Sequence, residues 1–280
     1  MKYKNLPTGE NISVLGLGTW RMGGSMTPDY SNDKQLVEIM QQAIQLGYSH
    51  IDTAEMYGGG HTEELIGRAT QRFARRELFI TTKVWQSNLH YQGVLNAVEG
   101  SLKRLHSDYV DMCLIHWPNM SFPLIESMRA LNHLVQQGKV RYVGVSNFDL
   151  ELLEQALEHS NTPIATNQVR YNLYHRKVQQ NGVLEFCQDQ GILLTAYTPF
   201  ERGTILNNPI VQQIAANHSA SPSQVALAWL IHQPNVITIP MSTRVAHLEQ
   251  NLGAIDLELN PEELELLNGL EMPEEALWPE

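Results

Sequence analysis

Four side chains of complementary chemistry stand at the ends of three successive apolar segments. Asp52 ends one segment and Tyr57 follows it, Lys83 ends the next, and His116 ends the third. A tyrosine hydroxyl ordinarily has a pKa of about 10, too high for ready proton exchange near neutrality, but a neighbouring ammonium favours the phenolate. A carboxylate can pair with that ammonium, and a neutral histidine can polarise a carbonyl oxygen. The set predicts Tyr57 as a general acid, tuned by Lys83 and Asp52, above a carbonyl that His116 orients.

A carbonyl carbon also needs a nucleophile. No activated serine or cysteine accompanies these four residues in the sequence, so a hydride cofactor is the expected supplier. Each residue alone has a structural alternative: Asp52 as a loop cap, Lys83 as a solvated cation, His116 as a core imidazole. Their coincidence on consecutive segments favours catalysis.

Eight short β-rich segments carry these and other polar residues. They recur roughly every 30 residues, the length of one strand plus one crossover helix. The segments between them have helical spacing, as in Leu36–Leu46 and Val94–Leu105, and Ser221–Gln224 has the pattern of a capping box. The eight expected strands are Val14–Gly18, Ser49–Asp52, Leu78–Lys83, Tyr109–Ile115, Val140–Ser146, Ile164–Gln168, Ile192–Tyr197 and Val236–Pro240.

Alternating strands and helices form either an open doubly wound sheet or a closed barrel. An open dinucleotide-binding sheet would show Gly-x-Gly-x-x-Gly, but Arg21 stands at the third position after Gly16 and Gly18. We therefore predict an α/β fold, a (β/α)₈ TIM barrel forming a single domain over residues 1–280, with 1–13 as a short N-terminal β-hairpin. In such a barrel the loops after the strands meet at one rim, where active sites lie.

Composition excludes several other classes. The net charge of −11 over 280 residues provides no net positive charge that would attract nucleic acid or an anionic membrane. Cys113 and Cys187 lie in apolar runs and are expected to be buried thiols of a reducing compartment, and no metal site is expected. No secretory leader or membrane-spanning stretch is recognisable, which predicts a cytoplasmic protein.

The four residues closely resemble the catalytic tetrad of the aldo-keto reductases. The resemblance extends to the motifs Gly16–Trp20, Gly47–Ala54, Asp111–Pro118 and Gly138–Phe148, and the chain is similar to bacterial-type members. It implies the barrel, a nicotinamide cofactor and the roles given above.

The resemblance also implies a set of cofactor-binding residues. Ser146, Asn147 and Gln168 match side chains that bind the nicotinamide carboxamide, and Tyr197 matches the ring that stacks on it. The structural alternatives are a helix cap for Ser146 and Asn147 and plain packing for Tyr197. The complete set is Thr19, Trp20, Ser146, Asn147, Gln168, Tyr197, Thr198, Pro199, Phe200, Ile239, Ser242, Arg244, Gln250 and Asn251.

The last of these segments departs from the family pattern. Met241 stands where many members have a lysine that pairs with the 2′-phosphate, and His247 replaces a common arginine. Arg244 matches a phosphate-facing arginine of bacterial-type members, although it could instead form a structural salt bridge. A guanidinium can grip a phosphate with two hydrogen bonds. We therefore expect NADPH, with NADH as the alternative.

Trp20, Trp85 and Trp117 each follow a strand and are expected to line a substrate pocket, with rim packing as the alternative. The expected function is NADPH-dependent reduction of a small aldehyde or ketone. One alternative is a non-catalytic, cofactor-binding regulatory subunit. A barrel hydrolase is rejected because the rim lacks the carboxylate pair that glycoside cleavage needs. A monomer is the default, with a small oligomer as the alternative.

Overall fold

The computed structural model describes residues 1–273, and its centre is a parallel sheet. In residues 1–273 the sheet has eight strands, each hydrogen-bonded to the next along the chain. The strands are β3 (Leu17–Gly18), β4 (His50–Asp52), β5 (Phe79–Val84), β6 (Val110–Ile115), β7 (Val140–Ser146), β8 (Ile164–Arg170), β9 (Leu193–Tyr197) and β10 (Val236–Thr238).

The sheet closes on itself where the chain before β3 meets β10. A parallel bridge joins Leu15 to Thr238, whose amide donates to Val14 O at 3.0 Å and whose carbonyl accepts from Gly16 N at 2.9 Å. The predicted barrel is confirmed. Its first strand is shorter than the predicted Val14–Gly18, because residues 14–16 bridge to β10 and only Leu17 and Gly18 pair with β4.

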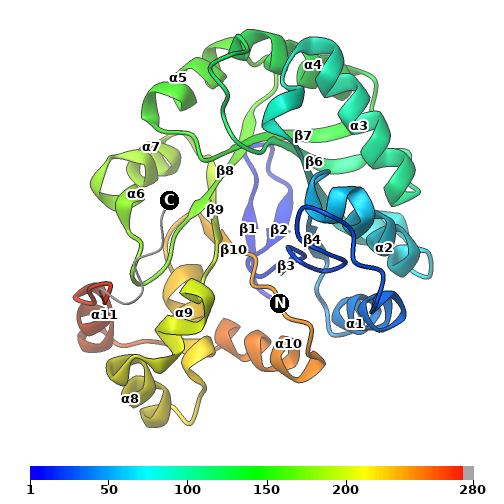
Figure 1. The fold of residues 1–280 in the computed structure, drawn as a ribbon. Helices are drawn as coiled ribbons and strands as arrows, with labels where there is room; N and C mark the ends of the chain where they lie inside the picture. The colour runs from blue at the N-terminus through cyan, green and yellow to red at the C-terminus, as the bar shows by residue number, and fades with distance from the viewer. Residues whose placement is uncertain (274–280) are drawn as a thin grey trace.

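Helices surround the barrel (Figure 1). α1 and α10 lie in contact, which brings the last part of the ring beside the first. The helices are α1 (Asp33–Gln45), α2 (His61–Thr70), α3 (Tyr91–Leu105), α4 (Leu124–Gln136), α5 (Leu150–His159), α6 (Lys177–Gln180), α7 (Val183–Asp189), α8 (Pro209–Asn217), α9 (Pro222–Ile231), α10 (Val245–Leu252) and α11 (Pro261–Asn268), with 3₁₀ turns η1 (Tyr57–Gly60), η2 (Arg75–Glu77), η3 (Gln86–Asn88), η4 (Glu201–Asn207) and η5 (Gly253–Ile255).

Ser221 caps α9 as the sequence predicts. Its side chain accepts from the Gln224 amide while the Gln224 side chain accepts from the Ser221 amide, which completes the capping box. These bonds satisfy two amides that would otherwise lack partners at the helix start.

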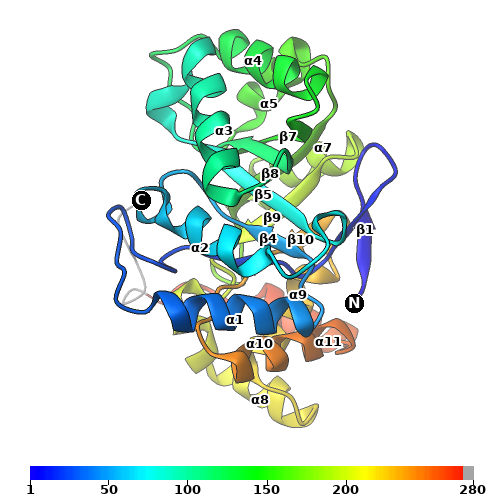
Figure 2. The ribbon, with the colours of Figure 1, turned by 90° about the vertical axis from the view of Figure 1, so that its right-hand side faces the viewer.

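The predicted N-terminal hairpin is present and plugs the barrel. It pairs β1 (Tyr3–Asn5) with β2 (Asn11–Ser13), and Leu6 and Ile12 belong to a buried cluster with interior residues such as Met112 and Leu114. In Figure 2 the hairpin lies on the right, whereas the segment leading into α1 lies on the left. The two ends of the barrel are therefore covered by different segments.

Both cysteines are buried free thiols, and burial raises the pKa of each. Within residues 1–273, no helix is long and apolar enough to cross a membrane.

Candidate active site

Strand register brings Asp52, Lys83 and His116 to one rim. Asp52 is paired with Thr81, so the next residue of β5 on the same face is Lys83. Lys83 is in turn paired with Leu114, and His116, two residues on, directly follows the end of β6 at Ile115. Each step along the sheet thus advances the inward-facing residue by two, in keeping with the tilt of barrel strands.

Lys83 is the centre of a buried hydrogen-bond network. Its Nζ donates to Asp52 Oδ1 at 2.6 Å and to the Thr53 carbonyl at 2.7 Å, and it lies 3.2 Å from the Tyr57 hydroxyl oxygen. Only 1% of Lys83 is exposed. A buried ammonium is stable when it is paired and hydrogen-bonded, and these oxygens provide both.

Asp52 is held from three other directions. Its Oδ2 accepts from the Gln168 side chain at 2.8 Å, and its carbonyl accepts from the Thr19 hydroxyl at 2.8 Å and the Thr19 amide at 3.1 Å. Gln168 comes from β8, so this contact spans the barrel interior. The carboxylate therefore cannot rotate without losing bonds on both sides.

Burial and charge oppose each other at the lysine–tyrosine pair. Burial acts to lower the pKa of Lys83, but Asp52 and Tyr57 outweigh it and the net pKa is raised. Burial raises the pKa of Tyr57, and Lys83 counteracts only part of this. Lys83 acts in the predicted direction, but the net pKa of the phenol is not lowered as expected, because desolvation is the larger effect. Tyr57 thus keeps its proton.

His116 lies beside Tyr57 as a neutral ring. The two ring centroids are 5.7 Å apart in a T-shaped arrangement, and Trp85 packs on the other side at 5.2 Å. Burial and the nearby Lys83 charge lower the pKa of His116 to about 2. Among residues 1–273 its Nδ1 has no hydrogen-bond partner, and Nε2 is the other ring nitrogen that could face a ligand.

A tight turn places Tyr57 over this network. Gly58 and Gly59 follow it with φ of 57° and 61°, the left-handed region that glycine enters at little cost. A Cβ on Gly58 would lie 2.6 Å from Gly23 O, so the turn also passes close to the segment after β3. That segment carries Trp20, whose ring centroid is 4.8 Å from that of Tyr57.

The residues at the ends of β7, β8 and β9 form a second network. Tyr197 OH donates to Asn147 Oδ1 at 2.8 Å, and Asn147 Nδ2 donates to Ser146 Oγ at 3.0 Å and to the His116 carbonyl at 3.1 Å. Ser146 Oγ donates to the Gln168 carbonyl at 2.8 Å. Burial raises the pKa of Tyr197 to about 12. Ser146, Asn147, Gln168 and Tyr197 are thus brought together, and Gln168 links them to Asp52.

The segment that follows β9 is held by a buried glutamate. Thr198, Pro199 and Phe200 lead to Glu201, which pairs with Arg170 and accepts from Asn172 at 2.7 Å. Asn172 also donates to the Thr198 carbonyl at 3.0 Å. Thr198 and Glu201 both have positive φ, and these contacts fix that strained path.

The segment after β10 presents the remaining predicted residues. Ile239, Ser242 and Asn251 are buried, whereas Arg244 and Gln250 are exposed. Ser242 Oγ accepts from the Arg244 amide at 3.1 Å at the start of α10. Among residues 1–273 the Arg244 guanidinium forms no salt bridge. Met241 is 39% exposed and His247 is also exposed.

The three predicted pocket tryptophans differ in placement. Trp20 packs on Tyr57 and Trp85 packs on His116, whereas Trp117 is 41% exposed and has no ring contact within the part of the chain described. Sequence reasoning missed Glu55, whose Oε1 accepts from the Trp85 amide at 2.6 Å and from Asn88 at 2.9 Å. The sequence does place Glu55 between Asp52 and Tyr57, which could have marked it as a residue near the site. The contact of Gln168 with Asp52 gave no signal in the sequence.

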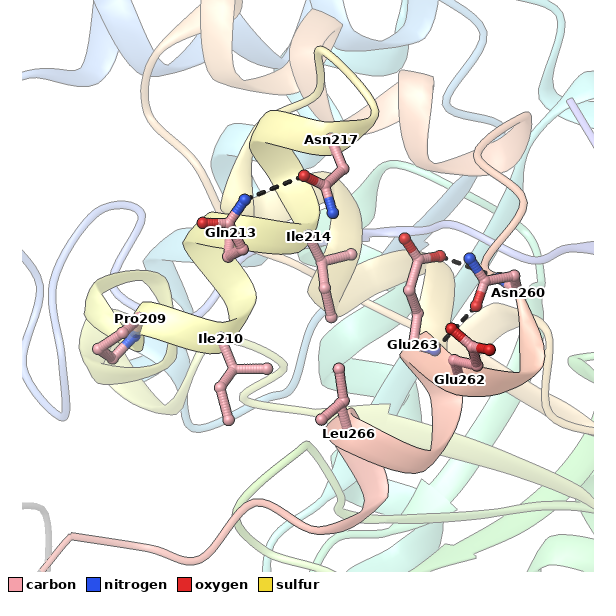
Figure 3. A pocket seen from close by; sticks show the side chains of 9 residues that line it. All are labelled: Pro209, Ile210, Gln213, Ile214, Asn217, Asn260, Glu262, Glu263 and Leu266. Atoms are coloured by element: carbon pink, nitrogen blue, oxygen red, sulfur yellow. Dashed lines mark hydrogen bonds between the residues drawn. The ribbon is translucent and has the colours of Figure 1, made fainter.

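A hollow of about 350 Å³ lies elsewhere, between α8 and α11. Figure 3 shows that Gln213 and Asn217 bond to each other and that Asn260 bonds to Glu263, so these polar groups brace their own helices. Ile210 and Leu266 line its open side. The tetrad, not this hollow, has the chemistry of an active site.

Comparison with known proteins adds independent observations. The family model described as "Aldo/keto reductase family" matches residues 14–271. Methylglyoxal reductase YeaE from Escherichia coli (strain K12) is 37% identical over 264 residues, covering 92% of this chain and 90% of that protein. The crystal structure of the thermostable aldo-keto reductase Tm1743 in complex with the inhibitor epalrestat is 50% identical, with a TM-score of 0.94 and coverage of 96% of this chain and 99% of that one. An aldo/keto reductase from Klebsiella pneumoniae in complex with NADP and acetate is 34% identical, with a TM-score of 0.85 and coverage of 94% and 93%.

Proposed function

The chain belongs to the aldo/keto reductase family, and from this premise we propose that it reduces small aldehydes and ketones to alcohols with NADPH, Tyr57 being the general acid. The observation that carries the proposal is the buried chain of contacts from Asp52 through Lys83 to the Tyr57 hydroxyl, with the neutral His116 ring beside it.

The protein groups have separable tasks. His116 donates from Nε2 to the carbonyl oxygen and orients it, because its pKa of about 2 keeps the ring neutral. Tyr57 gives its proton to the oxygen as negative charge develops there. The buried Lys83 ammonium, itself held by Asp52, stabilises the phenolate that remains. NADPH, when bound, would supply the hydride.

The residues present fit a dinucleotide. Asn147 and Ser146 offer amide and hydroxyl groups beside the Tyr197 ring, which has the flat face that a nicotinamide needs. Arg244, exposed and without a salt bridge in residues 1–273, is the residue that would hold the 2′-phosphate. Thr198–Phe200, Ile239, Ser242, Gln250 and Asn251 complete the proposed cofactor site, together with Thr19 and Trp20.

Small carbonyl compounds are the proposed substrates. Trp20 and Trp85 flank Tyr57 and His116, so an apolar wall borders the two polar groups. One relative is named a methylglyoxal reductase, which supports α-dicarbonyls as the first class to assay. We also propose that the protein acts in the cytoplasm.

The test is NADPH oxidation with methylglyoxal by the wild type and by Tyr57→Phe. Loss of the hydroxyl should lower kcat by at least about a hundredfold, since a positioned general acid contributes about 10²–10⁴ in rate. Cofactor affinity, measured by NADPH fluorescence titration, should stay near the wild-type value. If Tyr57→Phe keeps more than a tenth of the wild-type rate, Tyr57 is not the acid. A wild type that binds NADPH but turns over no carbonyl would favour the regulatory alternative.

A further inference from the structure

An imidazole with two carboxylate partners joins two segments of the active-site rim. His61 begins α2, and its Nε2 lies 2.8 Å from Asp33 Oδ1 while its Nδ1 lies 2.9 Å from Glu64 Oε2. The ring is almost completely buried, with 4% of its side chain exposed. Ionised carboxylates only accept hydrogen bonds, so both ring nitrogens must carry protons to satisfy this geometry. His61 is therefore held as an imidazolium.

The contacts of His61 tie the segment after β3 to the turn that carries Tyr57. Asp33 begins α1, directly after residues 19–32, and the ring of Tyr30 from that segment packs on His61 at 4.3 Å. His61 itself follows the Tyr57–Gly60 turn without a gap. The imidazolium thus bridges the end of one segment to the end of the other.

The other hydrogen bonds between residues 19–32 and the turn or α2 lie nearer the start of the segment than the contacts of His61 do. Residues 19–32 are joined to the turn and to α2 by the Gly58 amide, which donates to Ser25 O at 2.7 Å, and by the Thr62 hydroxyl, which donates to Met22 O at 2.7 Å. Tyr30 and most of its neighbours are exposed, so little apolar burial holds the outer part of the segment. At that end Asp33 is linked to α2 by two ionic contacts, to His61 at 2.8 Å and to Arg68 at 2.8 Å.

We propose that His61 is a positioning residue whose protonated ring binds Asp33 and Glu64 (the clasp) and thereby holds the outer part of the segment 19–32, which carries Trp20, beside the turn of Tyr57. The proposal rests on the function proposed above, because its expected effect on KM depends on Trp20 and Tyr57 having the roles given there. His61 touches neither substrate nor the reacting atoms; it acts through the segment 19–32.

The clasp should open as the pH rises. Burial acts to lower the pKa of His61, but the bonds to Glu64 and Asp33 outweigh it, so the net pKa is above its ordinary value. The stability that the protonated His61 ring adds is fully present at a pH below its ordinary pKa. It is lost as the pH rises through the raised pKa. The charged or titratable groups facing the ring are Asp33 on α1, Glu64 on α2, and Asp29 and Tyr30 before α1, and Arg68 shares Asp33.

The experiment compares wild type with His61→Gln and Glu64→Gln. Glutamine cannot donate to two carboxylates as a cation, so His61→Gln should raise KM for the carbonyl and lower kcat/KM by about tenfold, since misplaced substrate-positioning groups can cost up to about 10² in rate. The value of kcat should change little, because Lys83 still holds Tyr57. Glu64 is 49% exposed on its side chain, so Glu64→Gln should fold normally and shift the same pH dependence to lower pH.

His218→Gln is the matched control. His218 also pairs with a carboxylate, Glu263, at 2.8 Å, but it joins α8 to the start of α11 rather than the rim. The His218→Gln variant should have the same KM as the wild type. If His61→Gln and His218→Gln give the same KM and the same pH profile as the wild type, His61 has no positioning role.

A second readout does not depend on turnover. Hydrogen exchange of the amides in residues 19–32, corrected for intrinsic pH dependence, should show protection that falls at high pH in the wild type and is low at every pH in His61→Gln. NMR titration of the His61 ring, identified by its loss in His61→Gln, should give the same midpoint. Protection that is unaffected by His61→Gln overturns the proposal even if the enzyme reduces carbonyls. A wild type that reduces no carbonyl would instead remove the proposed function and leave the clasp to be decided by exchange alone.

Discussion

At the scale of single residues, the site depends on a lysine that is charged although almost no water reaches it. Lys83 has three oxygen partners, and the strongest attraction comes from Asp52 at 2.6 Å. Moving an ion out of water costs several kcal/mol, which pairing must offset. Removing either partner therefore has a consequence for stability as well as for chemistry.

We expect Asp52→Asn and Lys83→Met each to reduce the free energy of unfolding by about 3–5 kcal/mol, because each leaves one buried charge uncompensated. The double variant should cost clearly less than the sum, since it buries neither charge. Urea denaturation followed by circular dichroism measures all four proteins of the cycle. Additive costs would mean that the two charges do not stabilise each other. Both single variants should also lose carbonyl reduction, because the phenolate of Tyr57 is no longer stabilised.

At the scale of elements, the turn after β4 decides where Tyr57 lies. Gly58 and Gly59 have nearly the same left-handed φ, but they differ in surroundings. A Cβ on Gly58 would meet a backbone oxygen at 2.6 Å, whereas a Cβ on Gly59 would meet its nearest neighbour at 3.5 Å. Alanine at either position has nearly the same backbone strain, but only alanine at Gly58 also meets a close backbone atom. Comparing the two substitutions therefore separates the two effects.

Gly59→Ala should cost about 1–2 kcal/mol of stability, the usual penalty of a left-handed alanine, and should leave kcat close to the wild type. Gly58→Ala should cost more and should also reduce kcat, because the turn must move away from Gly23 and take Tyr57 with it. Thermal unfolding and NADPH oxidation test the two variants side by side. Equal effects of the two substitutions would show that the contact with Gly23 is unimportant.

The sequence predicted elements better than it predicted contacts between them. β7 begins and ends where its apolar run does, at Val140 and Ser146, because a strand buried on both faces is marked by residue type alone. The start of the barrel was predicted too long, since closure uses an isolated bridge at Leu15. The bond from Gln168 to Asp52 depends on two strands on opposite sides of the barrel, and no local pattern encodes that distance. Trp117 follows a strand as Trp85 does, yet it is 41% exposed, whereas Glu55 and Asn88 fix the Trp85 segment.

At the scale of the whole molecule, the two ends of the barrel have different tasks. The tetrad and the second network lie where the strands end, whereas the hairpin of β1 and β2 plugs the other end with Leu6 and Ile12. In barrels of this kind the first end is used for chemistry and the second for stability. Substitutions at the plug should therefore change stability without changing the reaction.

Ile12→Ala tests whether the plugged end of the barrel affects stability but not the reaction. Ile12 is 1% exposed inside the barrel, so its truncation should cost about 2–5 kcal/mol through lost burial and the cavity left behind. Ile210→Ala is the matched control, since that isoleucine is 36% exposed on α8 and should cost about 0.5 kcal/mol or less. Below the unfolding transition both variants should keep the wild-type kcat and KM, because the plug does not touch the rim. A fall in kcat for Ile12→Ala at a temperature where the protein is fully folded would show that the interior cluster transmits its packing to Lys83 and Asp52, and that the two ends are not independent.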